Sequence, residues 1–141
     1  MIIEKPCRRC GATIRLVPDP SCPDHQAGQL AASVLYCDRC ADYGWERSQV
    51  LHQIAREANA LVTVRSKPKR TDDDEAAIRS CVESIARLCR AFAGRCCEFY
   101  RVQLVWDQEF PTMLCQQPDK LKTVIGMYEQ GIRHIAKQLP A

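Results

Sequence analysis

The spacing of apolar and polar residues divides the chain into a front third with short apolar runs and a remainder with helical periodicity. The runs ATIRLV (12–17) and AASVLY (31–36) are short and rich in apolar residues, so they can pair as strands. Between them lies a Pro- and Gly-rich stretch, 18–28, which favours a surface loop. From 50 to 62, apolar residues recur at three- and four-residue spacing, and this pattern predicts an amphipathic helix.

The C-terminal half predicts two clear amphipathic helices. TDDDE (71–75) supplies a helix cap and an acidic first turn, and an apolar stripe follows from 78 to 92. Pro118 suits the first turn of a last helix, and its apolar stripe extends from 121 to 139.

Between these two helices the pattern is ambiguous, and the conformation of 96–117 stays open. Residues 96–110 fit both a helical face and a strand. We favour a helix ended by Pro111, because no strand partner follows. Three amphipathic helices with short connections imply a small antiparallel bundle over 72–141.

Ten of the 141 residues are cysteines, and four of them form two Cys-x-x-Cys pairs. The pairs are Cys7 with Cys10 and Cys37 with Cys40. Each such turn places two sulfurs on one side of an ion, and Gly11 helps the first turn to close. A tetrahedral Zn²⁺ binds four thiolates at about 2.3 Å, and four protein ligands leave no open position for water. The spacing therefore predicts one structural zinc ion.

Other interpretations of the cysteines remain open. A thioredoxin-like dithiol lacks a βαβ context, and an iron site of rubredoxin type lacks acidic, aromatic-rich surroundings. Cys22 and His25 form a Cys-x-x-His that could supply a third ligand pair. A two-ion site would need eight ligands, whereas the count reaches six, or seven with His52. A surface loop is the favoured account of Cys22 and His25.

A knuckle, a hairpin and then a helix carrying the last two ligands resembles a treble-clef zinc finger; two knuckles each with a hairpin would be a zinc ribbon. The resemblance covers 5–62 and depends on the four cysteines and Gly11. It implies a zinc-stabilised scaffold and no particular function. Such a segment is also similar to the N-terminal parts of some phage and bacterial replication accessory proteins. The ATP-binding domain of helicase loaders is absent, so loader activity is not implied.

The expected fold class is α+β, mostly α, with a small N-terminal zinc finger built from a β-hairpin plus helix. We expect a zinc domain with its following helix over 1–64, a basic linker over 65–71 and a three-helix bundle over 72–141. The five cysteines of the bundle show no knuckle spacing and are expected to be buried thiols. They are Cys81, Cys89, Cys96, Cys97 and Cys115.

Charge is distributed unevenly around a formal net charge of +3. Residues 49–71 carry five basic and one acidic side chain, whereas 1–48 carry six of each and 72–141 carry nine basic and ten acidic. The linker can contact phosphates or serve as a solvated hinge. The arginines within the cysteine pairs can form a second, small basic face. The candidate nucleic-acid-binding residues are Arg8, Arg9, Arg39, Arg65, Lys67, Lys69 and Arg70.

No phosphate-binding glycine loop, nucleophile elbow or His-Glu-x-x-His motif occurs, so we expect a non-catalytic protein. The favoured function is a zinc-binding accessory factor in a nucleic-acid transaction. The alternative is a protein–protein adaptor that offers its bundle to a partner or to its own copy. Trp106 and Phe110 would then be interface anchors, unless they close the bundle core. No secretion signal or stretch of 18 apolar residues occurs, so we expect a cytoplasmic protein without a membrane span.

Overall fold

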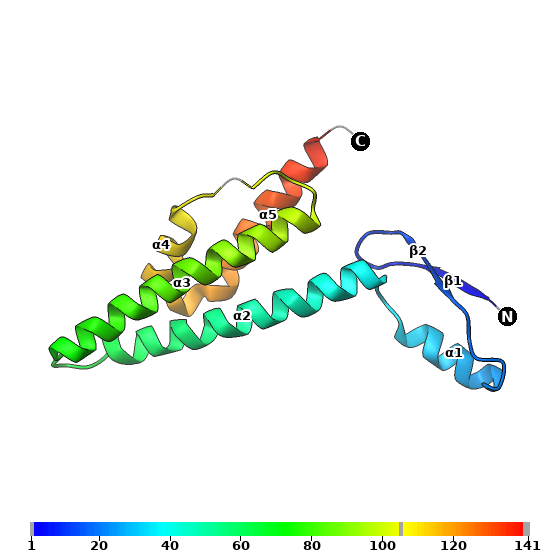
Figure 1. The fold of residues 1–141 in the computed structure, drawn as a ribbon, viewed down its shortest axis with the longest axis horizontal. Helices are drawn as coiled ribbons and strands as arrows, with labels where there is room; N and C mark the ends of the chain where they lie inside the picture. The colour runs from blue at the N-terminus through cyan, green and yellow to red at the C-terminus, as the bar shows by residue number, and fades with distance from the viewer. Residues whose placement is uncertain (1, 105, 140–141) are drawn as a thin grey trace. The chain divides into compact units, whose positions relative to one another are not determined.

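The computed structural model describes residues 2–104 and 106–139 of the chain. In these ranges it contains two short strands, five α-helices and one 3-10 turn, so the predicted α+β, mostly α class is confirmed (Figure 1). The described residues up to Glu46 pack into one compact unit, the N-terminal unit, and those from Arg47 onward into another, the C-terminal unit. Packing does not test whether a part folds by itself, so the domain limits expected from the sequence stay predictions.

An antiparallel hairpin brackets the first cysteine pair. It consists of β1 (Ile3–Pro6) and β2 (Thr13–Leu16), and Pro6 lies opposite Thr13 where the two strands meet the intervening turn. Side chains alternate across the hairpin, and Ile14 is buried. The strand predicted within 12–17 is therefore confirmed, although its partner is the segment that precedes the cysteine pair.

The strand predicted over 31–36 is wrong, because α1 (Asp24–Ser33) occupies the start of that run. Ala27 and Ala31 lie one helical turn apart and are buried. Alanine is the strongest helix former, so small residues at this spacing give a close-packing helical face. The stretch 18–28, expected to be a loop, is a loop only in its first part.

The helix expected after the second cysteine pair is confirmed. It is α2 (Asp38–Arg65), and it includes the whole predicted stretch 50–62. Its start belongs to the N-terminal unit, and the part from Arg47 belongs to the C-terminal unit. In that second part Ile54 and Leu61 are both 0% exposed, as the apolar stripe predicted.

The long helix α3 (Asp72–Phe99) begins with a complete capping box. The Thr71 side chain accepts from the Asp74 N–H, and the Asp74 carboxylate accepts from the Thr71 N–H at 2.9 Å. Burial raises the pKa of the Cys89 thiol to about 12, so this thiol is a protonated, apolar filler. All five cysteines predicted to be buried thiols are buried: Cys81, Cys89, Cys96, Cys97 and Cys115.

The helix predicted over 96–110 is wrong beyond the end of α3, where the chain forms a Schellman turn. The Val102 N–H donates to the Cys97 carbonyl at 2.9 Å, and Arg101 has a φ of 56°. Glycine usually takes this left-handed position, and no glycine marks it here. Buried Val102 supplies the apolar contact that accompanies the motif. Residue 105, which falls in the predicted helix, lies outside the described residues.

Three elements follow the turn: α4 (Glu109–Gln116), the 3-10 turn η1 (Pro118–Lys120) and α5 (Leu121–Gln138). Pro118 begins η1, as expected for the start of the last helix. Pro111 lies in the first turn of α4, where proline is tolerated, so the expected helix stop at Pro111 is wrong. No helix within the described ranges has the length and apolarity needed to cross a membrane.

Aromatic side chains form the centre of the C-terminal unit, where α3, α4 and α5 meet the second part of α2 (Figure 1). The rings of Phe110 and Tyr128 are stacked, with centroids 4.3 Å apart and planes 14° apart. Phe92 meets each of them at 6.2 Å. Such pairs stabilise a core by about 0.5–1.5 kcal/mol each beyond the area they bury.

A buried ion pair joins α2 to α5 within this unit. Arg47 donates from Nε to Glu129 Oε2 at 2.7 Å and from Nη2 to Glu129 Oε1 at 2.8 Å. Glu129 is only 4% exposed, so its charge depends on these bonds for the solvation that water would provide. Arg133 approaches the same carboxylate at 4.0 Å.

We predict that Glu129→Gln lowers the free energy of unfolding by about 2–4 kcal/mol, because it leaves a partly buried guanidinium without its charged partner. Urea unfolding monitored by circular dichroism measures the change. The matched control is Glu98→Gln, which breaks a surface pair with Arg95 and should cost about 0.5 kcal/mol or less. Equal losses in the two variants would show that the Arg47–Glu129 pair has no special role.

Candidate metal centre

The first cysteine pair lies on the turn between β1 and β2. The Gly11 N–H donates to the Cys7 carbonyl at 3.0 Å, and the Cys7 N–H donates to the Ala12 carbonyl at 2.8 Å. Gly11 has a φ of 74°, which a residue without a Cβ adopts at little cost. The Ala12 N–H then points to the Cys10 sulfur at 3.5 Å. The local sequence thus turns both sulfurs to one side of the hairpin.

The second pair lies at the start of α2. The Cys37 carbonyl accepts the first helical hydrogen bond, from the Ala41 N–H at 2.9 Å, so Cys37 is the N-cap residue. Cys40 therefore lies in the first helical turn, where the positive end of the helix dipole favours negative charge. The Cys37 N–H also donates to the Cys7 sulfur at 3.3 Å, which links the two pairs.

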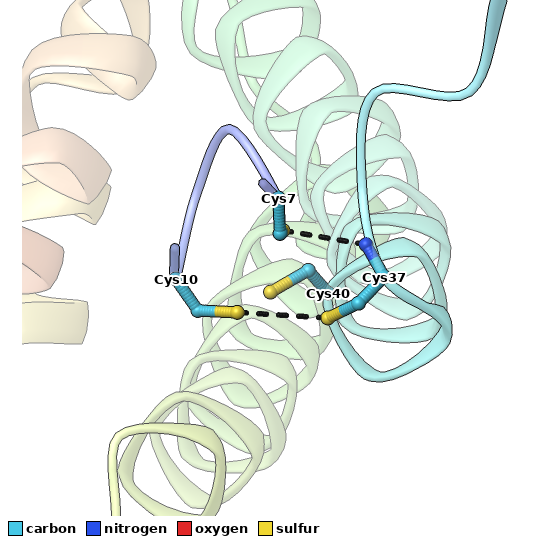
Figure 2. Close-up of side chains that lie close together, drawn as sticks. All are labelled: Cys7, Cys10, Cys37 and Cys40. Carbon is cyan, nitrogen blue, oxygen red and sulfur yellow. Dashed lines mark hydrogen bonds between the residues drawn. The ribbon is translucent and has the colours of Figure 1, made fainter. Parts of the chain in front are cut away.

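The four sulfurs converge on one point, as Figure 2 shows. The Sγ atoms of Cys7, Cys10, Cys37 and Cys40 all lie within 4.8 Å of one another, and those of Cys10 and Cys37 are 3.6 Å apart. Metal–sulfur bonds of about 2.3 Å in a regular tetrahedron would place the sulfurs about 3.8 Å apart. The cluster therefore has the size and the donor set to hold one metal ion.

The electrostatics of the cluster differ from one thiol to another. Burial raises the pKa of the Cys7 thiol, but hydrogen bonds from the backbone of Cys10, Cys37 and Arg9 outweigh it and bring the pKa to about 6. Burial and the neighbouring sulfurs raise the pKa of Cys40 instead. Four neighbouring thiols disfavour one another's ionisation, and a positive ion between them would stabilise the thiolate forms.

The other possible ligands lie apart from the cluster. Among the described residues, only the four cysteines form a group of this kind. Cys22 is half-buried and its thiol contacts the Pro23 carbonyl at 3.7 Å, while His25 is exposed on α1. This placement supports a site with four protein ligands.

The arginines of the two cysteine pairs lie between the candidate ligands along the chain. Arg8, Arg9 and Arg39 are all exposed. The Arg9 guanidinium lies over the rings of Tyr36 and Tyr43. These two tyrosines flank the second cysteine pair and were not predicted as site residues. The only sequence signal for them is an aromatic residue directly before Cys37 and another one turn after Arg39.

The basic residues of the linker are largely engaged with neighbouring groups. Lys67 Nζ lies 2.8 Å from Asp74 Oδ1, and this bond is the main reason that the pKa of Asp74 is lowered. Arg70 lies 3.2 Å from Glu75, and Arg65 donates to the carbonyl of Cys115 at the end of α4. Lys69 is exposed.

The two aromatic residues considered as interface anchors differ in burial. Phe110 is 5% exposed and belongs to the aromatic centre of the C-terminal unit. Trp106 is half-buried against the same core, with the Arg90 guanidinium 5.6 Å from its ring centre. Of these two residues, Trp106 is the one that presents aromatic surface to solvent.

Comparison with known proteins adds no relative from which a function could be transferred. No protein-family model, no curated protein and no solved structure matches this chain.

We predict that the purified full chain holds one divalent ion and that Cys7→Ser releases it. The loss of affinity should exceed the roughly 10–100-fold typical of changes outside the ligand set. Native mass spectrometry before and after chelation measures ion identity and number. The matched control, Cys22→Ser, should keep its ion. Two ions per chain, or a release caused by Cys22→Ser, would contradict the four-cysteine site.

Proposed function

We propose that this chain is a zinc-stabilised, non-catalytic accessory protein that binds nucleic acid through its N-terminal unit. The convergence of the four sulfurs, within 4.8 Å of one another, carries the proposal. That one site fixes the position of every arginine in the two cysteine pairs.

Zinc is the ion that this donor set favours. Four thiolates in a tetrahedral arrangement select zinc or iron, and zinc has no redox chemistry of its own. With all four positions filled by protein, no site remains for a substrate or an activated water. The ion then serves to stabilise the fold, which is its usual role in a Cys₄ site.

The arrangement supports the treble-clef resemblance in two respects. A hairpin carries the first two ligands on its turn, and a helix carries the last two at its N-terminus. It differs in the middle, where α1 occupies part of the hairpin expected from the runs 12–17 and 31–36. The likeness therefore favours a related scaffold and leaves the function to the surface residues.

Charge availability favours the cysteine pairs over the linker as the nucleic-acid contact. Arg8, Arg9 and Arg39 are exposed, whereas Lys67 and Arg70 already pair with acids of α3. A phosphate would have to displace those acids from the linker. Arg8 and Arg9 can release counterions without that competition.

A protein–protein adaptor is the second candidate, and one feature of the C-terminal unit favours it. A groove of about 520 Å³ lies between α2 and α5. Leu51, Leu121 and Ile125 give it an apolar lining, with His52 and Lys122 among its polar residues. A partner segment or a second copy of the chain could fill it.

We predict that the full chain binds an oligonucleotide with an affinity that falls steeply with salt. Replacing Arg8, Arg9 and Arg39 with alanine should reduce the slope of log K against log[salt] by about 2, since each phosphate contact to a single strand contributes about 0.7. Fluorescence anisotropy across a salt series measures both quantities.

The control replaces Lys67, Lys69 and Arg70 with alanine, which removes the same number of charges. This variant should change the slope by about 0.7 or less. A larger change of slope in the linker variant would show that the linker, and not the cysteine pairs, contacts the nucleic acid. Salt-independent binding of a protein partner, with no affinity for nucleic acid, would favour the adaptor.

A further inference from the structure

Beside the cysteine cluster, one arginine is held by two tyrosine rings. The Arg9 guanidinium lies 5.4 Å from the centre of the Tyr36 ring and 5.5 Å from that of the Tyr43 ring. Its Nη1 is 3.9 Å from the place that a Cβ on Gly44 would occupy, so the side chain follows the first turns of α2. Cation–π contacts at these distances hold the guanidinium in place.

Arg9, Tyr36 and Tyr43 together form what we call the stacking surface. Arg9 is exposed, Tyr36 is 39% exposed and Tyr43 is 5% exposed. The buried Tyr43 supports the guanidinium from inside the unit, while the other two planar groups reach solvent. The Arg8 N–H donates to the Leu35 carbonyl at 2.9 Å, which fixes the segment carrying Tyr36 against the turn of the first cysteine pair.

Three acidic residues of the N-terminal unit lie on a different side of α2 from Tyr43 and Gly44. Asp38, Asp42 and Glu46 follow at four-residue spacing and share one face of α2. Tyr43 and Gly44 fall about 100–160° around the helix from the centre of that face. The side of α2 that Arg9 follows therefore carries none of these three carboxylates.

We infer that the stacking surface binds an unpaired base of a single-stranded nucleic acid, with Arg8 and Arg39 contacting adjacent phosphates. The inference rests on the proposed function and names its ligand class. Every base has a flat π-face, and both tyrosine rings and guanidinium planes stack on it. A duplex keeps its bases stacked inside and offers only groove edges and phosphates to such groups.

The test measures fluorescence anisotropy of three fluorescein-labelled probes with the full, metal-loaded chain. The probes are an oligothymidylate, an oligouridylate and a mixed-sequence duplex of the same length. We expect at least one single strand to bind about tenfold or more tightly than the duplex. Tyr36→Ala should weaken single-strand binding about 5- to 100-fold, whereas Tyr36→Phe, which keeps the ring, should stay close to wild type.

Trp45 provides a matched control, because it is a 68% exposed aromatic residue that lies one turn after Asp42, on the acidic side of α2. Trp45→Ala should leave the affinity within about twofold of wild type. Metal content is measured for each variant. Should Tyr36→Ala lose its ion, Arg9→Lys takes its place in the comparison, since it keeps the charge and removes the planar group.

Each outcome has a distinct meaning. A preference for thymidylate or for uridylate identifies the strand and supports the inference in both cases. Equal affinity for single strand and duplex, or equal losses in Tyr36→Ala and Trp45→Ala, would overturn the stacking surface and leave a nucleic-acid function intact. Failure to bind all three probes would overturn the inference and the proposed function together.

Discussion

The convergence of four cysteine sulfurs is the constraint on which the N-terminal unit depends. Backbone N–H groups favour a thiolate at Cys7, whereas burial and neighbouring sulfurs oppose one at Cys40. A cation between them removes this conflict and turns four mutually repelling groups into ligands. The described part of this unit buries only one tyrosine and one isoleucine among its larger side chains. Coordination of an ion would supply stability that a small apolar core cannot.

The same coordination would also position the surface that we assign to nucleic acid. Arg8 and Arg9 are the two residues between the first pair of ligands, and Arg39 lies between the second pair. Their backbone positions are therefore tied to those of the four cysteines. Tyr36 precedes the second pair directly, so its ring comes beside Arg9 by the same construction. The four-cysteine site would thus stabilise the N-terminal unit and also position the proposed nucleic-acid contacts. A bound ion would do this without touching the nucleic acid.

The density of basic residues along the chain and their ion pairs in the structure favour different residues as the nucleic-acid contact. The linker is the densest basic run, yet acids of the next helix approach Lys67 and Arg70 closely. Both acids lie in the first turn of α3, where negative charge also favours the start of the helix. In the C-terminal unit, by contrast, the buried Glu129 pairs with a residue distant in the sequence, because its partner Arg47 is 82 residues away. An ion pair of that kind leaves no local pattern.

The sequence by itself determined the features that local spacing encodes: the class of fold, the four cysteines that meet, the cap at Thr71, the apolar stripes and the buried thiols. The sequence predicted the wrong element where one short pattern is compatible with two conformations. Residues 31–36 have the composition of a strand, but Ala31 packs with Ala27 on one face of a helix. The end of α3 uses Arg101 where glycine is usual, and only the burial of Val102 selects that turn. The stacking surface and the Arg47–Glu129 pair were decided by the tertiary structure alone, because long-range contacts depend on where whole elements lie and not on the spacing of residues within them.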